Sequence, residues 1–296
     1  MSAAGLEGVV QLSTHVIQIP LPTSTLPPEN ETNTYLIHSQ GECLLVDVGT
    51  DHPTTLSQLV NYVDARGNSR IVGLVATHYH HDHTAGLLIL ARSLQVPVYV
   101  HELDLALALR EMKRLSLPLG AEQFIVSAPA RLTVGELEIT LEHHPGHTHG
   151  HLHVLIPEDE VVLVGDHLSG FGTVWIGPPD GHMGSYYKAL DALVHQHYAI
   201  AGPGHGAAIH DVAAAAQALK HRRSQREDQM LAYLRENHYS AAQLVALIYG
   251  NSIPPDAIWV AEKTVLAHLQ HLLVRHKIRR SYDASTRTFY YEPTSS

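Results

Sequence analysis

The 296-residue chain contains one cysteine, Cys43. A lone cysteine excludes an internal disulfide and is typical of proteins from a reducing compartment. Cys43 lies in an apolar, strand-like stretch, and we expect it in the core. Residues 1–7 lack the basic and apolar segments of a secretory signal. These absences predict a cytoplasmic protein.

Long apolar runs and surplus positive charge are also missing. No run approaches the roughly 18 apolar residues of a membrane span, so we expect no membrane association. The chain contains 19 Lys and Arg and 29 Asp and Glu, which gives a formal net charge of −10. This balance argues against a general polyanion binder, because phosphate contacts require an excess of cations. A local basic patch is still compatible with it.

Histidine, in contrast, is abundant and is concentrated in the heptapeptide THYHHDH at residues 77–83, directly after an apolar run. A buried strand that ends in such polar groups is costly unless they bind something. The short loop can aim His78 and His80 at one metal ion, and Asp82 and His83 at a second. Imidazole combined with carboxylate suits zinc best, with iron or manganese as alternatives.

Three more candidate ligands follow other apolar, strand-like runs. His147 lies in PGHTHGH, Asp166 ends VVLVGD, and His205 lies in GPGHG. Each stands beside glycine, where the backbone can turn tightly. A histidine-rich surface loop would account for the heptapeptide alone, but not for this joint pattern. We therefore expect four strand ends to converge on one site.

The motifs THxHxDH, PGHT, GD and GPGH, in this order, resemble those of the metallo-β-lactamase-fold hydrolases. The resemblance spans residues 47–205 and implies an α/β protein, a four-layer αββα sandwich with two metal ions at its edge. The implied ligands are His78, His80 and His147 for the first ion, Asp82, His83 and His205 for the second, and Asp166 as a bridge.

Two further residues take supporting roles under this resemblance. Asp47 matches the family's first motif and would hold the ligand loop without binding metal, as carboxylates near ligating imidazoles do. His151, in the family's HTxGH variant, is the best candidate for a second group behind the ligands.

The C-terminal part of the chain predicts a separate domain. A helix over residues 211–235 would lead to helices over 240–249 and 257–276 and a hairpin over 280–291, the outline of a winged helix. This outline resembles the C-terminal extension of the lactamase-β-like branch of the family. We predict a catalytic domain (1–210), a linking helix (211–235) and a winged-helix-like domain (236–296).

A Gly/Pro loop over residues 176–184 resembles the PP-(D/E)-G-x-M loop of the same branch. His182 and Tyr186 are candidates to face the substrate, whereas Asp180 is interpreted as a turn residue. A helix is expected from Ser185, which could cap it.

The resemblance implies a dinuclear zinc-dependent hydrolase, in which a hydroxide between the metals attacks a small acyl substrate (thioester, ester or lactone). Asp82 or a metal-bound water is the expected proton shuttle. The alternatives are a metal-dependent endoribonuclease acting on single-stranded RNA and, less favoured, a non-catalytic binding protein that keeps the fold. The near balance of charge beyond residue 236 does not favour nucleic acid. A small-molecule substrate is the expected partner, and a homo-oligomer is left open.

Overall fold

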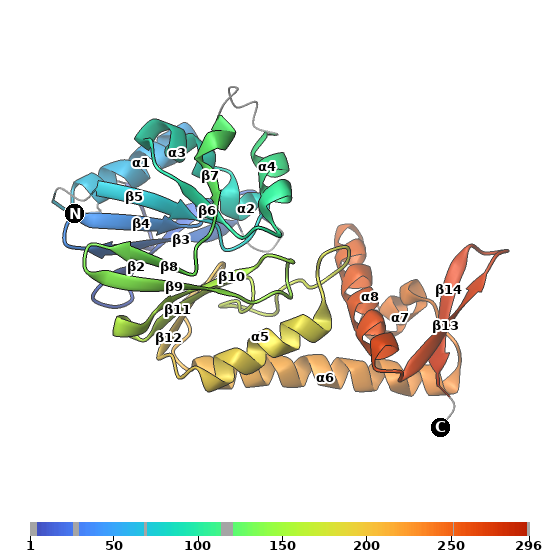
Figure 1. Ribbon diagram of the computed structural model, residues 1–296. Coiled ribbons are helices and arrows are strands. Elements are labelled where there is room, and N and C mark those ends of the chain that lie inside the picture. The colour runs from blue at the N-terminus through green and yellow to red at the C-terminus, as the bar shows by residue number, and fades with distance from the viewer. Residues whose placement is uncertain (1–4, 26–29, 68–69, 114–120, 251, 295–296) are drawn as a thin grey trace.

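The computed structural model describes residues 5–25, 30–67, 70–113, 121–250 and 252–294. Two β-sheets lie face to face, helices cover both outer faces, and a long helix leads to a smaller C-terminal domain (Figure 1). Within the described ranges, no helix combines the length and apolarity needed to cross a bilayer.

The first sheet has seven strands in sequence order, β1 to β7. They are β1 (Val10–Gln11), β2 (Val16–Pro22), β3 (Glu31–Ser39), β4 (Glu42–Val46), β5 (Arg70–Val75), β6 (Val98–Val100) and β7 (Ile125–Ser127). Pairing is antiparallel up to β4 and parallel from β4 onward. Its helices are α1 (Pro53–Asp64), α2 (His81–Thr84), α3 (Leu87–Leu94), α4 (Leu105–Lys113) and the 3₁₀ turn η1 (Ala121–Phe124).

The second sheet has the order β12-β11-β10-β9-β8. Its elements are β8 (Arg131–Val134), β9 (Leu137–His143), β10 (Leu152–Ile156), the 3₁₀ turn η2 (Pro157–Asp159), β11 (Val161–Gly165) and β12 (Ile200–Pro203). The helices α5 (Met183–His195) and α6 (Val212–Glu236) cover its outer face.

Period-two alternation along the strands builds this layering. In β4, Cys43 and Leu45 pack under α1 and α3, whereas Leu44 and Val46 face the second sheet. In β11, Val162 faces α5 and its neighbours in the strand face the first sheet. Each fully buried aliphatic side chain contributes roughly 1.5–3 kcal/mol. The predicted four-layer sandwich is confirmed, and Cys43 is a core residue as expected.

The C-terminal domain has its own hydrophobic core. It consists of α7 (Ala241–Tyr249), the 3₁₀ turn η3 (Pro255–Ala257), α8 (Ile258–Val274), β13 (Ile278–Asp283) and β14 (Thr288–Pro293). Ser240 and Gln243 form a capping box at the start of α7. The predicted order of helix, helix and hairpin is confirmed.

The helix α6 is shared by the two cores. Val212, Ala216 and Leu219, in its first half, pack with α5 against the second sheet. Met230 and Leu234, near its end, pack in the core of the C-terminal domain. The division of the chain at residues 210 and 235 stays a prediction, because this helix belongs to both sides.

A buried carboxylate forms hydrogen bonds that connect the two domains. Glu227 of α6 is 5% exposed, and its Oε1 accepts hydrogen bonds from Tyr187 Oη (3.0 Å), His268 Nδ1 (3.1 Å) and His271 Nδ1 (2.8 Å). Burial disfavours the charged carboxylate, but the hydrogen bonds from His268 and His271 outweigh it and lower the pKa of Glu227 to about 2. One charged group thus joins α5, α6 and α8.

We expect Glu227→Gln to lower the free energy of unfolding by about 2 kcal/mol at pH 7. Because the pKa in the folded chain lies below the ordinary value of 4.5, ionised Glu227 stabilises the fold above pH 4.5. This contribution declines as the pH falls from 4.5 toward 2. Denaturant titrations at pH 7 and pH 3 should therefore give a smaller difference at pH 3.

The matched control is Asp228→Asn, at the exposed neighbouring acid of the same helix, which should leave the free energy of unfolding unchanged at both pH values. A loss of equal size at pH 7 and pH 3 for Glu227→Gln would contradict the electrostatic account.

Candidate metal centre

Strand direction brings the four sequence motifs to one edge of the sandwich. The strands β9 and β11 run the same way, because both are antiparallel to β10, and β12 is parallel to β11. The β5 end joins them through a hydrogen bond from Leu152 N to Thr77 O (2.7 Å). The loops after β5, β9, β11 and β12 therefore meet, as the sequence predicts.

Three imidazoles form the first group. His78 Nε2 and His147 Nε2 each lie 2.9 Å from His80 Nδ1. The three ring planes are nearly perpendicular to one another, at 83°, 89° and 89°. Because the lone pair of an imidazole nitrogen lies in the ring plane, such rings can converge on one ion. The arrangement fits the three protein ligands of a tetrahedral site.

The second group consists of Asp82, His83 and His205, whose ligand atoms lie within 4.8 Å of one another. His205 Nε2 is 3.6 Å from Asp82 Oδ2, and the rings of His83 and His205 meet at 86°. Both histidines are buried, whereas the carboxylate of Asp82 is partly exposed, at 17%. This group is open to solvent through Asp82.

Asp166 lies between the two groups. Its Oδ2 is 3.5 Å from His147 Nε2, and its Oδ1 is 3.4 Å from His83 Nε2 and 3.6 Å from His205 Nε2. Asp166 Oδ1 and His83 Nε2 are buried and have no hydrogen-bond partner among the described residues. Buried polar atoms of this kind need a partner, and a cation between them would serve both. The donor set therefore fits two metal ions.

Hydrogen bonds behind the rings select the tautomers. His147 Nδ1 donates to Trp175 O (2.7 Å), His205 Nδ1 to Glu31 O (2.9 Å) and His83 Nδ1 to Asp47 Oδ2 (2.8 Å). Each Nε2 is then left as a lone pair that points into the site.

Asp47 supports two elements at once. Its carboxylate accepts hydrogen bonds from Thr77 N (2.8 Å) and Thr77 Oγ1 (2.7 Å) as well as from His83. Its backbone φ of 54° is unusual for a residue other than glycine. The strained backbone directs the buried carboxylate toward the ligand loop, in the supporting position that the resemblance implies.

The electrostatic setting favours the ligating protonation state at three of the candidate ligands, whereas neighbouring carboxylates outweigh burial and raise the pKa of His83 well above its usual range. Burial, and then neighbouring histidines, lower the pKa of His78 well below its usual range and that of His80 to about 3. For Asp166, burial favours the neutral acid, but His83 and His205 outweigh it and lower the pKa of the carboxyl. Neutral imidazole and ionised carboxylate are the forms that bind metal.

The comparisons with known proteins agree with this geometry. Residues 27–205, more than half of the chain, match the model of the metallo-beta-lactamase superfamily. The chain belongs to this superfamily. Residues 240–286 match the beta-lactamase associated winged helix domain, so both parts of this superfamily member have known counterparts.

Several curated and solved proteins are similar over most of the chain. An atrochrysone carboxyl ACP thioesterase of Aspergillus chevalieri is 27% identical, covering 82% of this chain and 75% of the relative. A beta-lactamase-like protein 2 homolog of Drosophila melanogaster is 26% identical, covering 98% and 99%. A metallo-beta-lactamase family protein of Thermus thermophilus superposes with a TM-score of 0.75 at 21% identity, covering 96% and 100%. At 21% identity, the similarity to the Thermus thermophilus protein shows a common fold.

In this superfamily member, two glycines permit the close packing of the ligand loops. A Cβ atom at Gly204 would lie 2.5 Å from Asp166 Oδ1 and 2.6 Å from His83 Cε1. Gly165 has a φ of 47°, and a Cβ there would lie 2.8 Å from His151 Nε2. Larger residues at either position would displace the ligands.

His151 lies behind Asp166, where its Nε2 accepts the backbone N–H of Asp166 (3.2 Å). It belongs to a buried cluster with His153 and His167. The rings of His151 and His167 stack at 3.9 Å with an interplanar angle of 22°, so their lone pairs cannot point at one ion. His153 Nε2 and His167 Nδ1 share a hydrogen bond (2.7 Å). We assign no third metal here.

The loop before α5 corrects two sequence predictions. Ser185 does not cap the helix: α5 begins at Met183, and His182 caps it by accepting the N–H of Ser185 (3.0 Å). Tyr186 does not face the substrate, because it is fully buried and donates to His167 O (2.8 Å). His182 is exposed, and its contact with substrate stays a prediction.

Three supporting groups were not identified from the sequence. Trp175 acts through its backbone oxygen, which has no sequence signature. Asp104 is buried, and its carboxylate accepts from Thr148 Oγ1 and Gly150 N, both at 2.7 Å. Asp180, interpreted as a turn residue, accepts the hydroxyl of Tyr79 (2.6 Å). These carboxylates can be recognised as supporting groups only when the fold shows that they are buried beside the histidine-rich loops.

We expect Asp47→Asn to weaken binding of the more weakly held zinc ion by about 10- to 100-fold, because the amide cannot accept from both Thr77 and His83. Competition titration with a chromogenic chelator measures the affinity. Asp51→Asn, at an exposed acid of the same loop, should bind zinc as the unaltered protein does. Equal zinc affinity in Asp47→Asn and the unaltered protein would refute the supporting role.

Proposed function

We propose that this member of the metallo-beta-lactamase superfamily is a dinuclear zinc-dependent hydrolase of small acyl substrates, with thioesters as the first class to test. The observation that carries the proposal is Asp166, whose two oxygens face two separate groups of histidine nitrogens. The relative from Aspergillus chevalieri is named a thioesterase, which supports a thioester rather than an ester or lactone.

The proposed ligands are His78, His80 and His147 for one zinc ion and Asp82, His83 and His205 for the other, with Asp166 shared. Nitrogen ligands with few carboxylates favour zinc over magnesium or calcium, whereas iron and manganese would also accept this set. When bound, two such ions lower the pKa of a water molecule and polarise a carbonyl oxygen.

Asp82 is the proposed proton carrier. Its carboxylate is partly exposed, unlike the buried His83 beside it, so it can reach the attacking water as well as the leaving group. In thioester hydrolysis, water adds to the acyl carbon, the carbon–sulfur bond breaks, and a carboxylic acid and a thiol result; the acid then loses its proton to solvent. Asp82 would take the proton of the water and deliver it to the sulfur.

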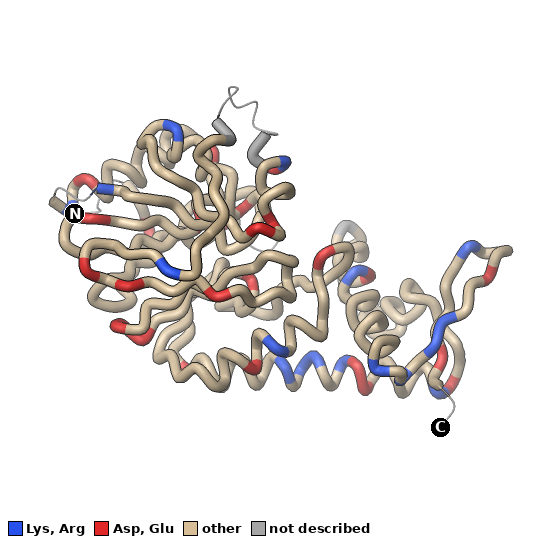
Figure 2. The backbone as a smooth tube through the Cα atoms, in the orientation of Figure 1, with Lys and Arg blue, Asp and Glu red and all other residues tan. Residues whose placement is uncertain are grey.

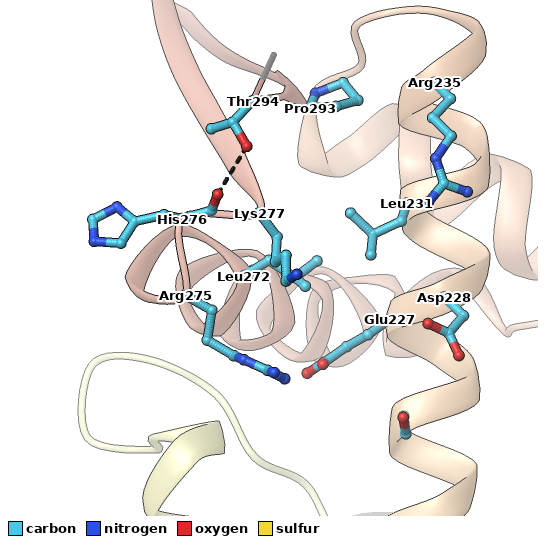
Figure 3. A pocket seen from close by; sticks show the side chains of 11 residues that line it. Glu227, Asp228, Leu231, Arg235, Leu272, Arg275, His276, Lys277, Pro293 and Thr294 are labelled. Atoms are coloured by element: carbon cyan, nitrogen blue, oxygen red, sulfur yellow. Dashed lines mark hydrogen bonds between the residues drawn. The ribbon is translucent and has the colours of Figure 1, made fainter. Parts of the chain in front are cut away.

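Charge distribution favours a small molecule over RNA. Figure 2 shows Lys and Arg of α6 and the C-terminal domain interspersed with Asp and Glu. Three cations, Arg235, Arg275 and Lys277, line a cavity of about 620 Å³ together with the acids Glu227 and Asp228 (Figure 3). Arg279 pairs with an acid on the neighbouring strand (3.0 Å). The basic residues are thus largely matched by acids, which a phosphate-binding surface would not favour.

We expect zinc-loaded protein to hydrolyse acyl thioesters and Asp82→Ala to lower kcat/KM by at least about 100-fold, because it removes both a ligand and the proton carrier. The assay should compare thioesters, lactones and a fluorogenic single-stranded RNA. His81→Ala, a substitution in the same heptapeptide at a residue outside the ligand groups, should retain activity. Cleavage of RNA alone, lost in Asp82→Ala, would replace this proposal by the endoribonuclease.

We expect two equivalents of zinc per chain in the purified protein and about one in His205→Ala, because that substitution removes a ligand from one group only. Elemental analysis after exhaustive dialysis measures the ratio. Dialysis against a strong chelator should abolish turnover, and added zinc should restore it. Full activity in the metal-free protein would contradict the proposal.

A further inference from the structure

The wall of the metal centre beside His80 is aromatic. The indole ring of Trp175 lies 6.1 Å from the imidazole of His80, with the two planes 25° apart. The same residue accepts the hydrogen bond of His147 through its backbone oxygen. Trp175 is partly buried as a residue, and its indole Nε1 is buried without a hydrogen-bond partner among the described residues.

The C-terminal domain extends this wall. Trp259, in the first turn of α8, lies 6.0 Å from Trp175 with an interplanar angle of 71°. Gly177 is where the loop after Trp175 passes against α8, because a Cβ there would lie 2.8 Å from Lys263 Cβ and 2.7 Å from Trp175 Nε1. The first two turns of α8 therefore pack against the loop that carries Trp175.

Trp259 is 48% exposed and the preceding Ile258 is 46% exposed. Large apolar side chains that remain exposed beside a reactive centre indicate a ligand surface. Two indoles in an edge-to-face arrangement leave a corner whose two faces suit a planar ring, since aromatic groups associate offset or edge-on at about 4.5–7 Å.

We propose that Trp175 and Trp259 form a binding subsite for a planar aromatic acyl group, whose carbonyl carbon would lie toward His80. The inference rests on the proposed hydrolase function, and it names the substrate class within it. It also gives the C-terminal domain a direct part in substrate selection, through α8.

The chain provides its own probe for this subsite. It contains two tryptophans, Trp175 and Trp259, so all tryptophan emission comes from this wall. We expect 4-nitrobenzoate, an aromatic carboxylate of the product class, to quench the emission of the zinc-loaded protein saturably. Hexanoate at the same concentrations should quench little. Absence of saturable quenching by the aromatic acid would overturn the subsite, whatever the hydrolytic activity is.

Kinetics supply the second arm, with benzoyl and acetyl thioesters of the same thiol. We expect Trp259→Ala to raise KM for the benzoyl thioester by about three- to tenfold, which corresponds to the strength of one aromatic pair. The kcat for the benzoyl thioester and the KM for the acetyl thioester should change little. Trp259→Phe should restore most of the affinity. Phe289→Ala, at an exposed aromatic residue of the C-terminal hairpin, is the matched control and should leave KM for both thioesters unchanged.

The two arms separate the two proposals. Saturable quenching without hydrolysis of either thioester would support the aromatic subsite and contradict the proposed thioesterase activity. Hydrolysis with equal effects of Trp259→Ala on both thioesters would keep the thioesterase and overturn the subsite. Stronger quenching by a uridine oligonucleotide than by 4-nitrobenzoate would replace the acyl group by a nucleobase and overturn the assignment.

Discussion

The arrangement of the sandwich depends on one negative charge with little access to solvent, the carboxylate of Asp166, whose side chain is 14% exposed. Its oxygens face His147 on one side and His83 and His205 on the other, at 3.4–3.6 Å. A carboxylate in such a place is costly unless positive charge compensates it. The strands that end at this point, the glycines that allow the loops to approach, and the hydrogen bonds behind the rings all serve to hold ligand atoms around that charge.

The sequence predicts the fold, and it predicts that the candidate ligands lie together, because both features leave strong local signals. Apolar alternation identifies strands such as β4, and histidine or aspartate at the end of an apolar run indicates where the strands must meet. The prediction fails where the signal is not local. Tyr186 has the polar hydroxyl of a site residue, but the partner that buries it, the backbone oxygen of His167, is known only from the structure.

The supporting groups illustrate the same limit. Trp175 fixes His147 through a carbonyl that every residue type possesses, so its side chain gives no hint of this role. Asp104 lies more than 40 residues from Thr148 and Gly150 in the sequence, and its carboxylate resembles an ordinary surface charge until the loops are brought together. Sequence patterns report on periodicity and composition, whereas these contacts depend on tertiary approach.

Both hydrophobic cores include residues of α6. Its first half is buried under the second sheet and its last turns in the C-terminal domain, and a helix propagates its hydrogen bonds from turn to turn. Neither core can open at α6 without weakening the other, so amide hydrogens of both should exchange at similar rates, as one cooperative unit. Removal of the C-terminal domain would therefore expose the apolar side chains near the end of α6, among them Met230 and Leu234.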